Sequence, residues 1–366
     1  MSKINLKDYI VPARLYNTDN NGNYGDGRFD TIDLIFLEAA EIRTYDGVRM
    51  YNGPVEQHKT SPTDYALVNG ALQSWPDYKT DKKGQAITWL RSADFFGVKV
   101  FDPNGYCNFK DVDTRNVSLR PVLHINLSSV ISARSASRDL FKIGTVKNDN
   151  GDELYHTIEF GEYPKTYVGE KLNAELEKAY MCLDAGYIKP TGKKYTGHIN
   201  NDNKVIYHNE YEYRGQKYVR VKVKSNADKN FYSDGTKILD RKWAWIKVEP
   251  IVWEIRNWDS LPEEINPNGD GSAEYMEEYI EVRTEEAIAC LPFYPNLEDE
   301  NTLFWQNSLV RGYLNGINVN NISTNGNLDY TAPNGGNFLH QNFLTEALDL
   351  SMVYSLTKQI NDEFSI

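Results

Sequence analysis

Short apolar runs separated by polar turns dominate the hydrophobic pattern of the chain. Residues 217–223 alternate strictly between apolar and polar side chains, mostly basic, which predicts a strand with one apolar face and one basic face. Residues 29–42 form an apolar stretch whose periodicity fits a buried strand and a short helix equally well. Other apolar runs bounded by turn residues predict strands at 87–90, 98–101, 117–125 and 243–255.

Helical signals are fewer. Residues 62–70 predict a helix or turn that begins with Thr63 or Asp64 as its cap. Residues 307–315 and 338–360 are also predicted to be helical, the second from its apolar spacing. Strands and helices are mixed without a regular strand–helix–strand alternation, so the pattern predicts the α+β class.

The chain has no fixed-period repeat, but its composition shifts along its length. Residues 128–138 are rich in Ser, Ala and Arg, which is typical of a linker. We therefore expect four parts: an extension at 1–30, a half-domain at 31–127, a linker at 128–154 and a second half-domain at 155–366.

Composition and charge exclude several classes of protein. Aromatic residues make up 13% of the 366 residues, too many for a disordered chain. The net charge of −12 argues against a nucleic acid as the main partner. No apolar run approaches the ~18 residues of a membrane span, and the chain starts without an apolar signal segment. We therefore expect no membrane span and no Sec-type export.

The three cysteines, Cys107, Cys182 and Cys290, are too few and too scattered for a disulfide framework or a four-ligand zinc site. The sequence thus predicts an acidic globular protein that stays reduced in a cytoplasm and needs no cofactor. Its 25 tyrosines outnumber its 14 phenylalanines, and Asn is abundant. Tyr and Asn are typical of adaptable recognition surfaces, but at any single position the turns and ring edges of a loop-rich β protein are the favoured explanation.

Six motifs together carry a family resemblance. One is the apolar stretch 35–42 followed by Thr-Asp-Tyr-Ala at 63–66. Residues 87–92 read Ile-Thr-Trp-Leu-Arg-Ser, and residues 118–123 read Ser-Leu-Arg-Pro-Val-Leu. Residues 160–165 read Phe-Gly-Glu-Tyr-Pro-Lys, 249–253 read Glu-Pro-Ile-Val-Trp, and 308–315 read Ser-Leu-Val-Arg-Gly-Tyr-Leu-Asn. The combination resembles a domain of unknown function, common in gut bacteria and their phages, with the signatures WWLRS…GVRPAL and GEYPQ…EPIxW. The resemblance implies a fold related to C-type lectins and to the formylglycine-generating enzyme.

The two halves of this signature stand in swapped order. In the family the GEYP and EPIxW pieces come first, whereas here the WLRS and RPVL pieces lead. We interpret the order as a circular permutation, or as two half-domains that are completed by a neighbouring subunit. The chain also departs from the family at Ala93-Asp94, where Pro-Gly is usual, and at Lys165, where Gln is usual.

The signature contains a structural hub of five residues: Trp89, Arg91, Arg120, Glu249 and Trp253. An arginine in an apolar strand must be paired if it is buried. Glu249, between Val248 and Pro250, is the expected partner of the two arginines. An anion or sugar-acid site is the alternative.

The segment 93–117 lies between the two framework strands of the signature, and the resemblance places it on the ligand-binding face of a lectin-like fold. Recognition residues concentrate on loops that a rigid scaffold holds, although an ordinary polar loop fits the composition as well. The candidate ligand or partner contacts are Phe95, Phe96, Tyr106, Asn108, Asp111, Asp113, Arg115 and Asn116.

Metal binding and catalysis find little support in the sequence. The Asn/Asp/Gly stretch 17–33 hints at a calcium loop, but carboxylates are missing from its first ligand positions, which favours a turn. The six histidines show no metal-binding spacing, and His124 in an apolar run is a core residue by default. Glu285-Glu286 fits a solvated helix face. Formylglycine-generating relatives need a cysteine pair, and Cys107 has no near partner.

Three functions remain as hypotheses. The first is a non-enzymatic structural or binding component of a phage particle, such as a capsid decoration, fibre or tail adaptor, that is assembled in the host cytoplasm as a homo-oligomer. Its partners would be other virion or cell-surface proteins, or glycans. The second is a lectin-like adhesin of the bacterial cell surface, and the third is an enzyme of the formylglycine-generating type.

Overall fold

The computed structural model describes about two thirds of the chain. The described residues are 9–15, 31–39, 41–44, 47–50, 58–74, 84–94, 97–128, 130, 142–148, 150–183, 186–225, 227–257, 279–294, 304–316, 338 and 341–349.

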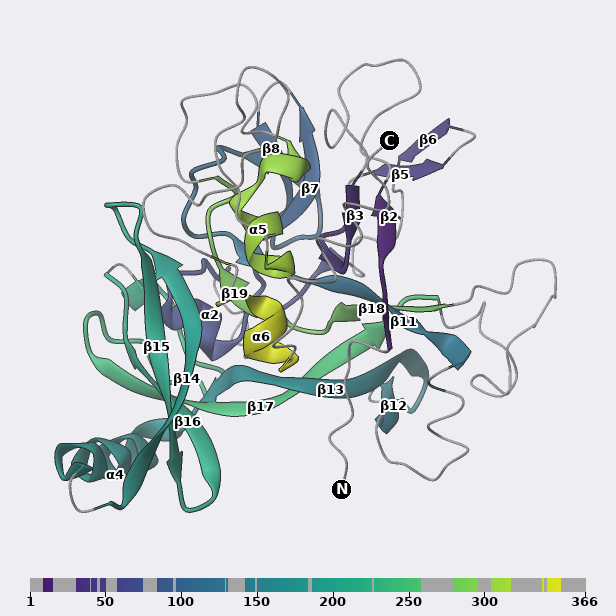
Figure 1. The fold of residues 1–366 in the computed structure, drawn as a ribbon. Helices are drawn as coiled ribbons and strands as arrows, with labels where there is room; N and C mark the ends of the chain where they lie inside the picture. The colour runs from purple at the N-terminus through teal and green to yellow at the C-terminus, as the bar shows by residue number, and fades with distance from the viewer. Residues whose placement is uncertain are drawn as a thin grey trace.

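A ten-stranded, entirely antiparallel sheet forms the centre of the molecule (Figure 1). Its main path runs β1-β11-β18-β17-β16-β15-β14, β4 also pairs with β11, and β13 joins β17 to β12. Its strands are β1 (Ile10–Val11), β4 (Ile35–Phe36), β11 (Val122–Asn126), β12 (Lys142–Lys147), β13 (Glu153–Tyr167), β14 (Ile188–Ile199), β15 (Val205–Tyr213), β16 (Gln216–Lys222), β17 (Trp243–Ile255) and β18 (Tyr279–Thr284).

A second, five-stranded sheet has the order β19-β10-β7-β8-β9. It contains β7 (Thr88–Asp94), β8 (Gly97–Phe101), β9 (Cys107–Lys110), β10 (Ser118–Leu119) and β19 (Ala289–Cys290). Two small ribbons complete the strands: β2 (Ala13–Leu15) with β3 (Thr31–Asp33), and β5 (Glu41–Thr44) with β6 (Gly47–Met50).

The described helices are short, apart from one. They are α2 (Asp64–Val68), α4 (Gly169–Met181), α5 (Leu309–Asn315) and α6 (Phe343–Ala347), with the 3-10 turns η3 (Ala227–Lys229) and η6 (Trp305–Asn307). Thr63 caps α2 by accepting a hydrogen bond from the N–H of Ala66, and Ser308 caps α5 in the same way. Among the described helices, α4 alone exceeds ten residues.

The two segments that carry the swapped signature share this architecture. Strand β11, from the RPVL motif, pairs with β18, and β18 pairs with the Trp253–Ile255 end of β17. One continuous cluster of buried apolar side chains includes Trp89 and Leu123 as well as Ile158 and Trp253. Within one chain, the segment before residue 128 and the segment after residue 155 therefore build one sheet and one core.

The Gly-Glu-Tyr-Pro motif forms a bulge in β13. The register with β17 shifts between Glu159 and Glu162, and Gly161 there has a positive φ of 72°. A Cβ atom on Gly161 would lie 2.7 Å from the backbone oxygen of Ala347, at the end of α6. Glycine is thus required both for the left-handed backbone of the bulge and for the close approach of α6.

The class and most strands agree with the sequence. The structure is mixed, with mostly antiparallel sheets and few helices, as the α+β prediction requires. The ambiguous stretch 29–42 contains strands in its described part, and the helix predicted over 338–360 is described only as α6. The Ser/Ala/Arg-rich first part of the predicted linker 128–154 lies mostly outside the described residues, and its second part contains the strand β12 and the start of β13.

Candidate functional site

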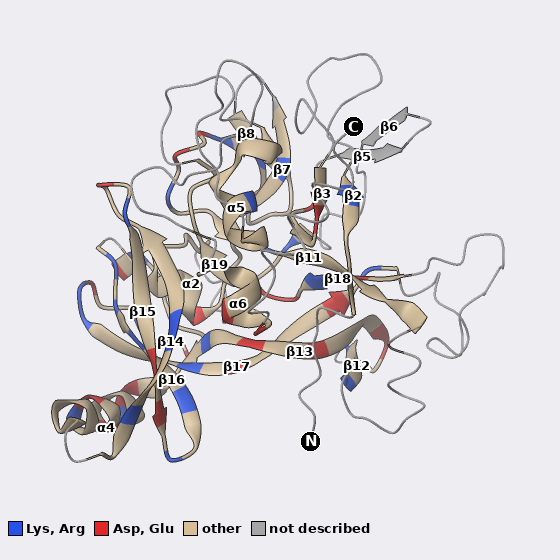
Figure 2. Cartoon of the chain, in the orientation of Figure 1, with Lys and Arg blue, Asp and Glu red and all other residues tan. Residues whose placement is uncertain are grey.

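The buried arginine of the RPVL motif belongs to a cluster of five charged residues, called here the Arg120 cluster: Glu38, Arg120, Glu254, Arg256 and Arg283. Arg120 contacts the Glu254 carboxylate at 3.1 Å and donates through Nε to the carbonyl of Thr284 at 2.9 Å. The Glu254 carboxylate also accepts hydrogen bonds from the guanidinium groups of Arg283 and Arg256, each at 2.8 Å. Figure 2 shows acidic and basic residues side by side where β17 meets β18.

Glu38 completes the cluster from the segment that follows β4. Its carboxylate accepts two bonds from Arg283, at 2.7 and 2.6 Å. Burial by itself would raise the pKa of both glutamates, but the arginines lower the pKa of Glu38 and bring that of Glu254 to about 2. The cluster therefore joins four distant segments through ionised, buried side chains.

The predicted partner of Arg120 was wrong. Arg120 pairs with Glu254 near the end of β17, whereas Glu249 lies in the middle of the strand and pairs with Lys247 at 2.9 Å. The two glutamates are five residues apart on β17, an odd separation that in a regular strand puts them on opposite faces. The prediction placed a glutamate on the correct strand, but five residues too early.

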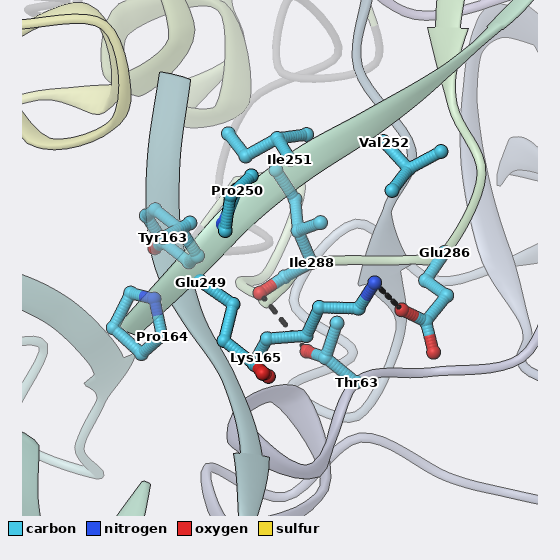
Figure 3. Close-up of a pocket in the computed structure, with 10 residues that line it drawn as sticks. All are labelled: Thr63, Tyr163, Pro164, Lys165, Glu249, Pro250, Ile251, Val252, Glu286 and Ile288. Atoms are coloured by element: carbon cyan, nitrogen blue, oxygen red, sulfur yellow. Dashed lines mark hydrogen bonds and ion pairs between the residues drawn. The ribbon is translucent and has the colours of Figure 1, made fainter. Parts of the chain in front are cut away.

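Glu249 instead lines a small depression with a volume of about 10 Å³ (Figure 3). Lys165 crosses its floor and pairs with Glu286 at 2.7 Å, while the hydroxyl of Thr63 donates to the carbonyl of Ile288 at 3.5 Å. Its charged side chains are thus already paired, and the contact ties β13 to the segment before β19. The remaining lining residues are Tyr163, Pro164, Pro250, Ile251 and Val252.

The other hub residues lie in the core. The indole N–H of Trp89 donates to the carbonyl of Leu291 at 2.9 Å, and that of Trp253 donates to the carbonyl of Phe160 at 3.0 Å. Arg91 is buried and its backbone N–H donates to the carbonyl of Glu38 at 2.9 Å. Both signature tryptophans therefore connect strands that are distant in sequence.

The predicted recognition segment divides into an exposed part and an anchored part. The exposed part is β9 with its flanks, where Tyr106 is 62% and Phe109 46% exposed and where Asn108 and Asp111 are also exposed. Among the described strands β9 pairs only with β8, so it forms an edge of the five-stranded sheet. All four of its residues are exposed, which means that neither of its faces is covered.

The anchored part runs from Val112 to Val117, both of which are buried. The guanidinium of Arg115 donates to the carbonyls of Ile199 and Asn200 and to the side chain of Asn203, at the turn between β14 and β15. Asp113 and Asn116 are half-buried, and the carbonyl of Asn116 accepts from the N–H of Leu72 at 2.9 Å. Arg115 and Asn116 therefore hold the segment in place, whereas Tyr106, Asn108 and Asp111 are exposed to solvent.

Some candidates lie outside the described residues. These are Phe95, Phe96 and most of the 17–33 stretch considered for calcium. Asp33 at the end of that stretch is described, and it is buried against Arg311 at 2.7 Å and the indole N–H of Trp305 at 2.9 Å. The Asp33 carboxylate is therefore already used in buried hydrogen bonds with Arg311 and Trp305.

The titratable side chains considered for chemistry are mostly buried and satisfied. His124 lies 3.1 Å from Glu281 and stacks on Tyr279, as expected of a core histidine. His198 and His208 both contact the side-chain oxygen of Asn69, at 3.1 and 2.9 Å. Burial lowers the pKa of these two histidines to about 3 and about 4, so both are neutral N–H donors at pH 7.

The cysteines are free thiols. Cys107 lies on β9 and Cys290 on β19, at opposite edges of the five-stranded sheet. Four strand spacings separate them, about 19 Å, far more than a disulfide allows.

Within the described ranges no group of three or more His, Cys, Asp or Glu side chains is placed to hold a metal ion. None of the described helices is long and apolar enough to span a membrane.

Sequence reasoning missed two buried polar groups. Glu286 is not on a solvated helix face as expected, because residues 285–288 are irregular and its side chain is only 11% exposed. Glu346 on α6 accepts bonds from Thr196, Tyr313 and Gln341, at 2.7 to 2.9 Å. The one sequence signal for each glutamate is a charged residue beside apolar residues. In a short segment this pattern fits a buried and an exposed glutamate equally well.

Comparisons of the chain with protein-family models, with curated proteins and with solved structures found no match.

Proposed function

We propose that the protein is a non-enzymatic structural component of a phage particle and that the β9 edge is the surface through which it meets its neighbours, other copies of the chain first. The phage assignment rests on the motif resemblance. The binding role is supported by one observation above all, an edge strand with both faces exposed that carries Tyr106 at its start and Phe109 within it.

A strand of this kind is rarely left open. Edge strands present unpaired backbone groups and pair readily with another strand, and a copy of the same strand can do so across a two-fold axis. Aromatic side chains with both an apolar and a hydrogen-bonding part are enriched at interfaces. The anchored part, with Arg115 at the β14–β15 turn, gives β9 a rigid base.

Sedimentation of the full-length chain tests this proposal. We expect a dimer or larger assembly, and we expect the double variant Tyr106→Ala/Phe109→Ala to sediment as a monomer with an unchanged melting temperature. The matched control is Tyr187→Ala, which removes a 71% exposed tyrosine elsewhere and should leave the assembly intact. A wild-type monomer at all concentrations, or a double variant that still assembles, would contradict the proposal.

A further inference from the structure

A second aromatic surface lies across the molecule from β9, on the outer face of the ten-stranded sheet. Here α4 packs over β15, β16 and β17 and covers a small separate core that contains Leu176, Tyr211 and Trp245 (Figure 1). Trp243, at the start of β17, lies beside this core and remains 42% exposed.

The Trp243 ring is held in place by stacking. The guanidinium of Arg220 lies over it, 3.5 Å from the ring centroid, and also over the ring of Tyr180 at 4.1 Å. Glu177 on α4 fixes the same guanidinium with two bonds of 2.8 and 3.0 Å. Arg220 is therefore neutralised by Glu177 and serves as a rigid support for the indole.

A cation stands next to this ring. Lys222 is the cross-strand partner of Trp243, so the two side chains project from the same face, about 5 Å apart at Cβ. Lys222 is exposed and forms no ion pair with any residue that the structure describes. A partly exposed indole ring thus lies beside an exposed lysine, and the side-chain amide of Asn173 on α4 donates to the Trp243 carbonyl at 3.4 Å.

We propose that Trp243 and Lys222 form a binding site for an acidic sugar within a glycan. The apolar face of a pyranose ring covers an indole ring, and the sugar's carboxylate or phosphate pairs with the ammonium group. A single negative charge per sugar suits one lysine, whereas the overall charge of −12 disfavours a densely charged polymer such as DNA. The site is independent of the β9 edge.

A glycan array tests this assignment. The array displays oligosaccharides with uronic acids, sialic acids or sugar phosphates beside their uncharged counterparts, and the best probe is then titrated by calorimetry. We expect saturable binding to an acidic glycan that weakens with salt, loss of binding in Trp243→Ala, and about tenfold weaker binding in Lys222→Gln. Lys189→Gln, which removes another exposed lysine on β14, should bind like the wild type.

Several results would overturn the proposal. These are no binding to any acidic glycan on the array, equal binding to the uncharged counterparts, or unchanged binding in Lys222→Gln, a surface variant that leaves the core untouched. Tighter binding of a single-stranded oligonucleotide at the same residues would also overturn it. Tyr106→Ala/Phe109→Ala should retain glycan binding, so failure of the particle proposal and failure of this one are separable.

Discussion

Two sites of the molecule contain arginine–glutamate ion pairs, but the pairs have different roles. In the Arg120 cluster, Arg283 is fully buried and donates to Glu38 and Glu254, which come from segments more than 200 residues apart. On the outer layer, Arg220 donates twice to Glu177, but all its partners come from neighbouring elements, and one of them, Trp243, is exposed. The first site joins distant segments, and the second supports a surface.

The difference shows how to separate structural from functional charge in this fold. A buried ion pair loses much of its Coulomb gain to desolvation, so its main effect appears when one partner is removed. A partly exposed pair costs less to form and less to break. Stability measurements should therefore rank the two sites, whereas binding measurements should respond to the outer one.

The largest expected effect comes from breaking the Arg120 cluster. Glu254→Ala leaves Arg120, Arg283 and Arg256 without their shared carboxylate, and we expect a loss of about 3–5 kcal/mol in the free energy of unfolding, measured with urea. Glu177→Ala is the matched variant on the outer layer and should lose less than half as much. Equal losses at the two positions would remove the distinction between the sites.

Acid should act on the Arg120 cluster next. The folded state lowers the pKa of Glu254 from 4.5 to about 2, so its contribution is complete above pH 4.5 and is lost as the pH falls toward 2. This contribution is on the order of 3 kcal/mol. His198 and His208 begin to act at higher pH: their lowered pKa values remove stability as the pH falls from 6.5 toward 4 for His208 and toward 3 for His198. Unfolding free energies measured from pH 7 to pH 2 should show both windows.

The variant Glu254→Gln separates these two windows. It should keep the histidine loss from pH 6.5 down to about 3 but remove the part of the loss below pH 4.5 that Glu254 contributes, leaving that of Glu38, whose pKa is also lowered. A wild-type curve with no acid loss below pH 4.5 would show that the cluster does not hold Glu254 ionised.

The smallest effect is expected at Glu249, the partner that the sequence predicted. Its pair with Lys247 is partly exposed, so Glu249→Ala should cost less than about 1 kcal/mol in urea unfolding. A loss as large as that of Glu254→Ala would restore Glu249 to the hub and contradict the structure.

Local pattern was sufficient for much of the fold. The strict alternation at 217–223 became β16, and the apolar run at 243–255 became β17 with its bounds unchanged. The cap at Thr63 was also foreseen. Such features depend on residues close in sequence, where side-chain period and hydrogen-bonding capacity decide the outcome.

The charged contacts were not predictable in the same way. The choice between Glu249 and Glu254 depends on the strand register of β17 with β18, where Glu254 faces Arg283, and no local pattern fixes that register. The outer arginine site was missed for a related reason, because Tyr180, Arg220 and Trp243 meet only after α4 has packed on the sheet. Within 93–117, composition did not separate the exposed Tyr106 from the anchoring Arg115.

The pairing of β11 with β18 also has a consequence for how the chain is made. Strand β11 can pair with β1 and β4 as soon as it leaves the ribosome, but its other edge must await β18, about 150 residues later. At about 5–20 residues per second, that delay is roughly 8–30 s. During this time the backbone edge of Val122, Leu123 and Ile125 is unpaired and can pair with another nascent chain. We therefore expect the chain to need chaperones during synthesis and to refold slowly from denaturant.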